Sequence, residues 1–207
     1  MKKNILILLI LFAGTLLNAQ SLETVCDSLA AKPVNTGDFL QTKTLQTTGR
    51  KLKSSGKYII CPEGILWHTQ KPVETSLILT KEKMVQIAAN GNKSVMNGKD
   101  NQVFANISET LSSVFSGDVK ALKKNFNCHL VTEKNGEWSI ELTPKDSTIA
   151  SVMKLLVLSG IWSKANEAEM TSLVMTEASE NTISYEFTNQ KYPEELTADE
   201  KQNFAIE

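Results

Sequence analysis

Arginine is nearly absent from this chain of 207 residues, because Arg50 is the only arginine among 22 basic residues. Proteins usually grip phosphate and carboxylate groups with a bidentate guanidinium, so its scarcity argues against recognition of such groups. Basic and acidic residues nearly balance, at a net charge of −1, and no long run of one sign occurs. We therefore do not expect a nucleic-acid partner.

Residues with the chemistry for catalysis are also scarce. The two histidines, His68 and His129, lie far apart in the sequence and have no metal-ligand spacing. Two Ser-x-x-Lys matches, at residues 54–57 and 151–154, lack the Ser-Asp-Asn and Lys-Thr-Gly partners of penicillin-type acyl enzymes. No phosphate-binding or dinucleotide fingerprint accompanies them. We expect no enzymatic activity, no metal site and no cofactor.

The N-terminal apolar run is too short to span a bilayer, which takes about 20 apolar residues. Residues 5–17 form this run, with Lys2 and Lys3 before it and Leu17-Asn18-Ala19 at its end. That order is typical of a secretory signal peptide. We predict a signal peptide over residues 1–19, and a periplasmic mature protein of one domain over residues 20–207.

Cysteine is sparse, and its number is odd for an oxidising compartment. Cys26, Cys61 and Cys128 allow either one disulfide with a free thiol or three buried thiols, and the spacing favours no pairing. Cys61 ends an apolar stretch before Pro62 and has no histidine nearby at a suggestive position. A small buried side chain is therefore expected there in preference to a reactive thiol.

Alternating apolar residues, in contrast, are plentiful. The segment "VETSLILT" places Val73, Thr75, Leu77 and Leu79 on one face of a strand. About five such strands precede a central helical region and about five follow it, which predicts one antiparallel sheet of roughly ten strands in a mainly β (α+β) fold. A sheet of that width has to curl. We expect its concave face to carry Trp67, Leu77, Leu79, Trp138 and Tyr185.

The central region has the periodicity of a helix. Phe104, Ile107, Leu111 and Phe115 share one helical face, and Asp118 is placed to cap a second helix. An apolar stripe on helices inserted into a sheet predicts a plug or lid over the concave face. At the C-terminus, the capping-box residues of 197–200 predict a short last helix.

The order of several small motifs resembles the outer-membrane lipoprotein carrier family (LolA-like). A Phe-x-Gln strand comes first, then a glycine before an aromatic strand, a proline turn into an apolar-x-Trp strand, a second proline and a late Leu-x-Pro. In this chain the motifs are Phe39 and Gln41, Gly56 and Tyr58, Pro62, Ile65 and Trp67, Pro72, and Leu142 with Pro144. The match follows nearly the whole chain after the predicted signal peptide.

The resemblance implies an incomplete β-barrel, closed by a helical lid over an apolar cavity. Members of this family carry acylated lipoproteins from an inner-membrane ABC transporter to an outer-membrane acceptor, and a monomer suffices for that task. By this likeness the acyl cavity would be lined by Ile65, Trp67, Leu77, Leu79, Val85, Ile87, Trp138, Ile140, Tyr185 and Phe187. The underside of the lid would be formed by Phe104, Ile107, Leu111 and Phe115.

One position departs from the family pattern. Typical carriers place an arginine directly before the proline matched by Pro62, where it hydrogen-bonds the lid, and this chain has Cys61 there. Two alternatives to a lipoprotein carrier therefore stay open. One is a carrier of another lipid or glycolipid, and the other is an envelope scaffold or regulator whose concavity is filled core.

Overall fold

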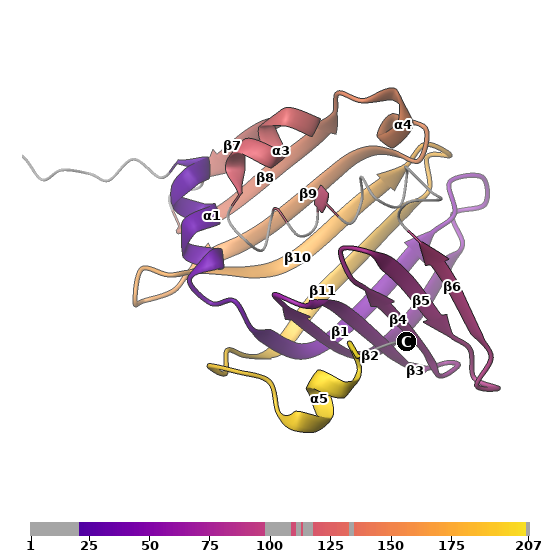
Figure 1. Cartoon of the computed structure of the whole chain (residues 1–207). Coiled ribbons are helices and arrows are strands. Elements are labelled where there is room, and N and C mark those ends of the chain that lie inside the picture. The colour runs from indigo at the N-terminus through magenta and orange to yellow at the C-terminus, as the bar shows by residue number, and fades with distance from the viewer. Residues whose placement is uncertain (1–20, 98–108, 111–112, 114–117, 133–134, 206–207) are drawn as a thin grey trace, which may run out of the picture.

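One wide antiparallel sheet organises the chain, as the computed structural model shows (Figure 1). The model describes residues 21–97, 109–110, 113, 118–132 and 135–205. The sheet has 11 strands in the order β6-β5-β4-β3-β2-β1-β11-β10-β9-β8-β7 and is not closed. The strands are β1 (Asn35–Thr44), β2 (Lys51–Cys61), β3 (Gly64–Lys71), β4 (Thr75–Leu79), β5 (Lys83–Ile87), β6 (Lys93–Asn97), β7 (Phe126–Thr132), β8 (Glu137–Pro144), β9 (Met153–Trp162), β10 (Ala168–Glu177) and β11 (Thr182–Lys191). The predicted fold class, a single open antiparallel sheet with a few helices, is confirmed.

Strand β6 was not predicted from the sequence. Alternation predicts about five strands before the central region, and the structure has six there, because Lys93–Asn97 pairs with β5. All five side chains of β6 are exposed, so the strand lacks the buried alternating face by which strands are recognised in a sequence.

The described helices are short and begin at polar caps. They are α1 (Leu22–Ala30), α3 (Val119–Asn125), α4 (Ser147–Ala150) and α5 (Ala198–Gln202). The Asp118 carboxylate accepts a hydrogen bond from the Ala121 backbone N–H at the start of α3, as predicted. Thr197 and Glu200 form the predicted capping box of α5.

Helices cover both faces of the sheet, in different places. Residues of α1, α3 and α4, among them Val25, Leu122 and Ile149, join the main apolar cluster on the concave face. The segment that leads into and out of α5 covers the opposite face of β2–β5, where Leu196 and Phe204 complete a second cluster. The two faces are therefore both apolar over part of the sheet.

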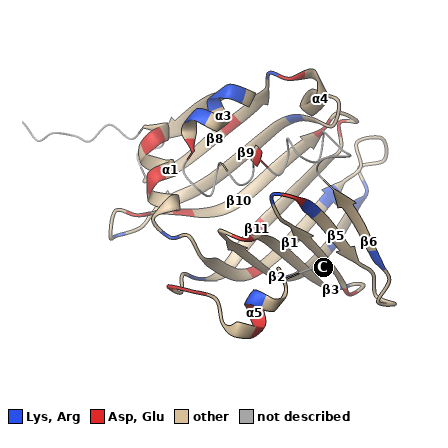
Figure 2. Ribbon diagram, in the orientation of Figure 1, with Lys and Arg blue, Asp and Glu red and all other residues tan. Residues whose placement is uncertain are grey.

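Ion pairs connect neighbouring elements at the surface. Figure 2 marks acidic residues in red on the ribbon of α1 and basic residues in blue on that of α3. The Lys123 Nζ of α3 lies 2.6 Å from the Glu23 Oε1 of α1. Because both side chains are about half exposed, this pair contributes little to stability and serves to orient the two helices.

Candidate functional site

Five aromatic side chains, Phe39, Tyr58, Trp67, Tyr185 and Phe187, gather on the concave face. The Tyr58 and Phe187 ring centroids lie 5.0 Å apart, and those of Trp67 and Tyr185 lie 5.7 Å apart. Phe39 packs on Tyr185 at 5.9 Å. Trp67 on β3 and Tyr185 on β11 are three strands apart, which would separate them by roughly 14 Å in a flat sheet. Their contact is therefore a direct result of the curl.

Most of the predicted cavity residues belong to this face. Trp67 and Leu77 are directly opposite each other in the β3–β4 register and so point to the same side. The main apolar cluster of this face takes in Ile65, Trp67, Leu79, Trp138, Ile140, Tyr185 and Phe187. The structure thus brings eight of the ten predicted residues together.

Val85 and Ile87 are not on the concave face, which corrects their expected position. In the β4–β5 register Val85 is opposite Ile78, and Leu79 is opposite Met84. Since Leu79 faces the concavity, Met84 does so as well, and Val85 points the other way into the second cluster beneath Leu196. The sequence gives the correct period for β5 with the phase reversed, because the C-terminal segment makes both faces of this strand apolar.

Cys61, the position of the family's lid arginine, also lies on the face away from the concavity. It is 8% exposed and belongs to the cluster of Val85, while its strand neighbour Ile60 belongs to the concave cluster. The thiol donates to the Gly64 carbonyl at 3.4 Å. Burial raises the pKa of Cys61 to about 12, so the group is an uncharged thiol at neutral pH. Cys26, Cys61 and Cys128 are all free thiols.

The predicted lid residues Phe104, Ile107, Leu111 and Phe115 lie outside the described residues. The three tryptophans of the chain, in contrast, are all described and all belong to the concave face: Trp67 on β3, Trp138 on β8 and Trp162 on β9.

Three residues of β10 on the concave face were not predicted from the sequence. Met170, Leu173 and Met175 all join the main cluster or pack against it. Met170 and Leu173 are three positions apart, which breaks strand alternation, because the register between β9 and β10 shifts between Met170 and Ser172. An alternation of period two across this bulge assigns Met170 and Leu173 to opposite faces, which is why sequence reasoning did not find the group.

The two halves of the concave face differ in how they are covered. On β8, Trp138 and Ile140 are 2% and 1% exposed, in the cluster to which α1, α3 and α4 contribute. At the other end, Leu52 on β2 is 43% exposed and Met96 on β6 is 37% exposed. Leu52 is opposite Lys43 and Met96 is opposite Met84 in the strand register, and both partners face the concavity, so Leu52 and Met96 face it too. The β7–β10 half is thus filled core. The β2–β6 half is also buried at Tyr58, Ile60 and Ile65, and it keeps apolar side chains accessible at Leu52 and Met96.

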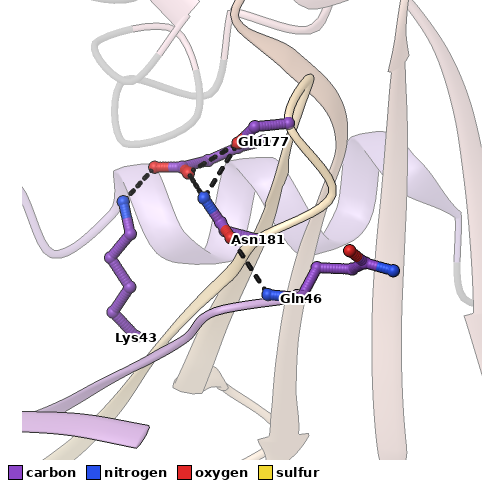
Figure 3. A network of polar contacts seen from close by, with 5 residues as sticks. Lys43, Gln46, Glu177 and Asn181 are labelled. Atoms are coloured by element: carbon purple, nitrogen blue, oxygen red, sulfur yellow. Dashed lines mark hydrogen bonds and ion pairs between the residues drawn. The ribbon is translucent and has the colours of Figure 1, made fainter. Parts of the chain in front are cut away.

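A polar network lies beside the concave face, at the ends of β1 and β10 (Figure 3). The Lys43 ammonium donates to Glu177 at 2.7 Å, and Asn181 donates to the other carboxylate oxygen at 2.8 Å. The backbone N–H of Gln46 donates to the Asn181 side chain at 3.0 Å. Burial by itself would raise the pKa of Glu177, but the hydrogen bonds from Lys43, Asn181 and Ser179 outweigh it and hold that pKa below 4.5.

A second polar network closes the concave cluster at the opposite end of β1. The Tyr58 hydroxyl donates to Asn35 Oδ1 at 2.9 Å, and Asn35 donates to Gln190 Oε1 at 3.3 Å. The Tyr192 hydroxyl donates to the same Gln190 oxygen at 2.7 Å. Burial raises the pKa of Tyr58, which stays a neutral donor. The polar groups at this end therefore have their partners within the protein.

The described residues include neither a cluster of metal-ligating side chains nor a helix that could span a bilayer. In those ranges no three His, Cys, Asp or Glu side chains come close enough together to hold an ion. Nor is any helix of the described ranges sufficiently long and apolar to cross a bilayer.

The sequence matches the model of a known protein family over most of its length. Residues 33–202 match the model of the outer membrane lipoprotein carrier protein LolA. The chain belongs to the LolA family. That match covers all eleven strands and α5, so the family resemblance of the small motifs is confirmed.

Solved structures with a similar fold are distant in sequence from this LolA-family chain. A LolA superfamily protein from Nitrosomonas europaea is 8% identical, with a TM-score of 0.45, over 87% of this chain and 97% of that one. A DUF1329 family protein from Desulfovibrio piger is 14% identical, with a TM-score of 0.45, over 90% and 96%. The lipoprotein LppX of Mycobacterium tuberculosis is 8% identical, with a TM-score of 0.41, over 85% and 98%. A comparison with curated protein sequences finds no match.

Proposed function

We propose that this protein is a periplasmic carrier that holds the acyl chains of a lipoprotein, or of a related lipid, against its concave face. The observation that carries the proposal is the unequal cover of that face. The half over β7–β10 is sealed, with Ile140 1% exposed, while the β2–β6 half leaves Leu52 43% exposed. An accessible apolar wall beside a rigid core is what a reversible acyl-binding site requires.

The energetics of an acyl chain fit such a wall. Each CH₂ group removed from water contributes about 0.8 kcal/mol, so one long acyl chain gains on the order of 10 kcal/mol before entropic costs. The aromatic cluster of Phe39, Trp67 and Tyr185 offers broad rigid surfaces for these contacts. The protein needs only to hide and release the chain, so we propose binding without catalysis, by a monomer and with no cofactor.

The family supplies the proposed partners. By analogy with lipoprotein carriers, an inner-membrane ABC transporter would load the protein and an outer-membrane acceptor would unload it. Residues 1–19 would act as the export signal. The helical segment that bears Phe104, Ile107, Leu111 and Phe115 would cover the bound chain as a lid.

The test is uptake and displacement of an apolar fluorescent probe. The native protein should bind the probe, and long-chain acylated peptide should displace it. Leu77→Glu places a charge on the concave wall and should weaken probe binding at least tenfold, while Val85→Thr, on the opposite face, should not. No probe uptake by the folded wild-type protein would contradict the proposal.

A filled-core envelope protein is the second candidate, and the β7–β10 half favours it. Trp138, Leu142 and Leu158 are at most 2% exposed, so no ligand reaches them in this conformation. Mass spectrometry of the protein purified gently from its own periplasm separates the candidates. Stoichiometric lipoprotein or lipid supports the carrier, while a ligand-free protein that also excludes the probe supports the scaffold.

A further inference from the structure

The three tryptophans of the concave face share an unusual feature. In the described part of the chain, the indole nitrogens of Trp67, Trp138 and Trp162 are buried and have no hydrogen-bond partner. A buried N–H donor without an acceptor is costly, and native proteins rarely retain one without a reason. Trp138 and Trp162 lie in the β7–β10 half, so Trp67 on β3 is the one of the three that the proposed ligand would approach.

Trp67 is distinguished by what lies beside it. Its ring centroid is 5.7 Å from that of Tyr185, whose hydroxyl makes no hydrogen bond to any residue that the structure describes. The other two tyrosines, the buried Tyr58 and the half-buried Tyr192, both donate their hydroxyls to side chains. Burial raises the pKa of Tyr185 to about 12, so its hydroxyl keeps its proton at neutral pH. The Trp67 N–H is thus a buried donor without an acceptor, and beside it stands a half-buried tyrosine whose hydroxyl has no partner among the described residues.

The surroundings of this pair are aromatic on one side and polar on the other, because Gln41 is the direct cross-strand neighbour of Tyr185 and accepts a hydrogen bond from Ser54. Tyr185 packs against the rings of Phe39 and Phe187, at 5.9 and 6.4 Å. The ion pair on this side of the sheet, Lys43 with Glu177, satisfies its own charges at the ends of β1 and β10. Two donors without a cation, in an aromatic environment, suit a neutral acceptor and would leave an anionic phosphate uncompensated.

We propose that the Trp67 N–H and the Tyr185 O–H form a polar subsite that binds the carbonyl oxygen by which an acyl chain is esterified to its lipid. This inference rests on the proposed function, because it assumes that an acyl lipid enters the concave face. It adds to that function a preference among lipids. A hydrocarbon chain has no acceptor, so the subsite fixes the depth of the chain by its carbonyl end and favours esters over ethers.

The experiment compares two lipids that differ only in this carbonyl. A diacylglycerol ester and the dialkylglycerol ether of equal chain length compete with the same apolar fluorescent probe for the wild-type protein. The ester should bind at least about fivefold more tightly, as expected for roughly one net hydrogen bond. Tyr185→Phe removes only the hydroxyl and should reduce this preference by about threefold or more, with the affinity for the ether unchanged. Trp67→Phe should also reduce the preference.

Tyr192→Phe is the matched control. It removes a hydroxyl that already donates to Gln190, outside the proposed subsite, and should leave the ester preference at its wild-type value. Thermal unfolding of each variant shows whether it is folded, and the ester-to-ether ratio within one variant does not depend on the amount of folded protein.

The outcomes separate the two proposals. Equal binding of ester and ether by the wild-type protein overturns the subsite and leaves the carrier function standing. A loss of affinity in Tyr185→Phe that is the same for both lipids also overturns it, because the hydroxyl would then act on the fold. Failure of both lipids to displace the probe, or of the probe to bind, rejects the carrier function itself.

Discussion

Burial controls the chemistry of the three cysteines. It raises the pKa of Cys26 to about 12, with a smaller contribution from the nearby Cys128, and it raises the pKa of Cys61 to about 12. The thiolate is the reactive form, so both groups are inert in the folded protein. Cys128 on the edge strand β7 is only half-buried, although burial raises its pKa too.

The rate at which each cysteine is alkylated in the folded protein should therefore follow the exposure of its thiol. We expect iodoacetamide at pH 8 to modify Cys128 first, with Cys26 and Cys61 reacting only as fast as the fold opens. Peptide mass spectrometry over time measures the three rates separately. Cys128→Ser should abolish the fast phase, and a Cys61 that reacts as quickly as Cys128 would contradict the assignment of Cys61 to a closed cluster.

Gly160 on β9 shows how closely the filled half is packed. A Cβ added at this position would collide with the Trp138 ring and with the Glu169 carbonyl oxygen of the next strand. Gly160→Ala should destabilise the protein by about 1–3 kcal/mol, the usual range for overpacking. Urea unfolding measures the change, with Ser159→Ala on the same strand as the control. An unaffected midpoint would mean that Trp138 moves freely and that this half of the core is loose.

Among the elements, the two hairpins beside the concave face are joined by the Lys43–Glu177 ion pair. Their side chains are 30% and 20% exposed, so the pair is partly shielded from solvent. A double-mutant cycle with Lys43→Met and Glu177→Gln should give a coupling of about 0.5–1 kcal/mol at neutral pH. The exposed pair of Lys201 and Glu195 provides the comparison and should show no measurable coupling.

The coupling should depend on pH in one direction. The pKa of Glu177 is lower in the folded protein than its ordinary value of 4.5, so the stabilisation is complete above pH 4.5. It is lost as the pH falls through the lowered folded pKa, because the protonated carboxyl no longer attracts Lys43. A coupling that persists at pH 2 would show that the contact is not ionic.

The sequence predicts strands well wherever one face is buried and the other is exposed to solvent. Trp67 and Leu77 follow that rule, and their common face is confirmed. The rule fails at Val85. There the C-terminal segment makes the second face of β5 apolar as well, so alternation does not determine which side chains face the concavity. The rule fails again around Met170, because the register shift there depends on pairing with β9 and cannot be recognised in the sequence of β10 alone. Long-range cover and pairing are the information that single strands lack.

At the scale of the whole molecule, one curled sheet performs two tasks. Helices α1, α3 and α4 contribute to the cluster that seals β7–β10, and the C-terminal segment supports the outer face of β2–β5. The strands that face the proposed ligand are thus stabilised from behind by Leu196 and its neighbours, in addition to the contacts of Ile60 and Ile65 in the concave cluster. Such an arrangement keeps the wall in place whether or not a chain is bound.

Hydrogen exchange should show this division directly. We expect the amides of β8 and β9 to exchange slowest, since their inward side chains are almost fully buried, and those of β6 to exchange fast, since all its side chains are exposed. A bound acyl lipid adds contacts only on the accessible half, so under conditions where amides exchange by local opening it should slow exchange in β3–β5 more than in β8 and β9. Leu77→Glu, which blocks the wall, should remove this effect, and Val85→Thr should not. Protection that appears equally in both halves would mean that the ligand stabilises the entire fold, and the concave face would then act as one cooperative unit.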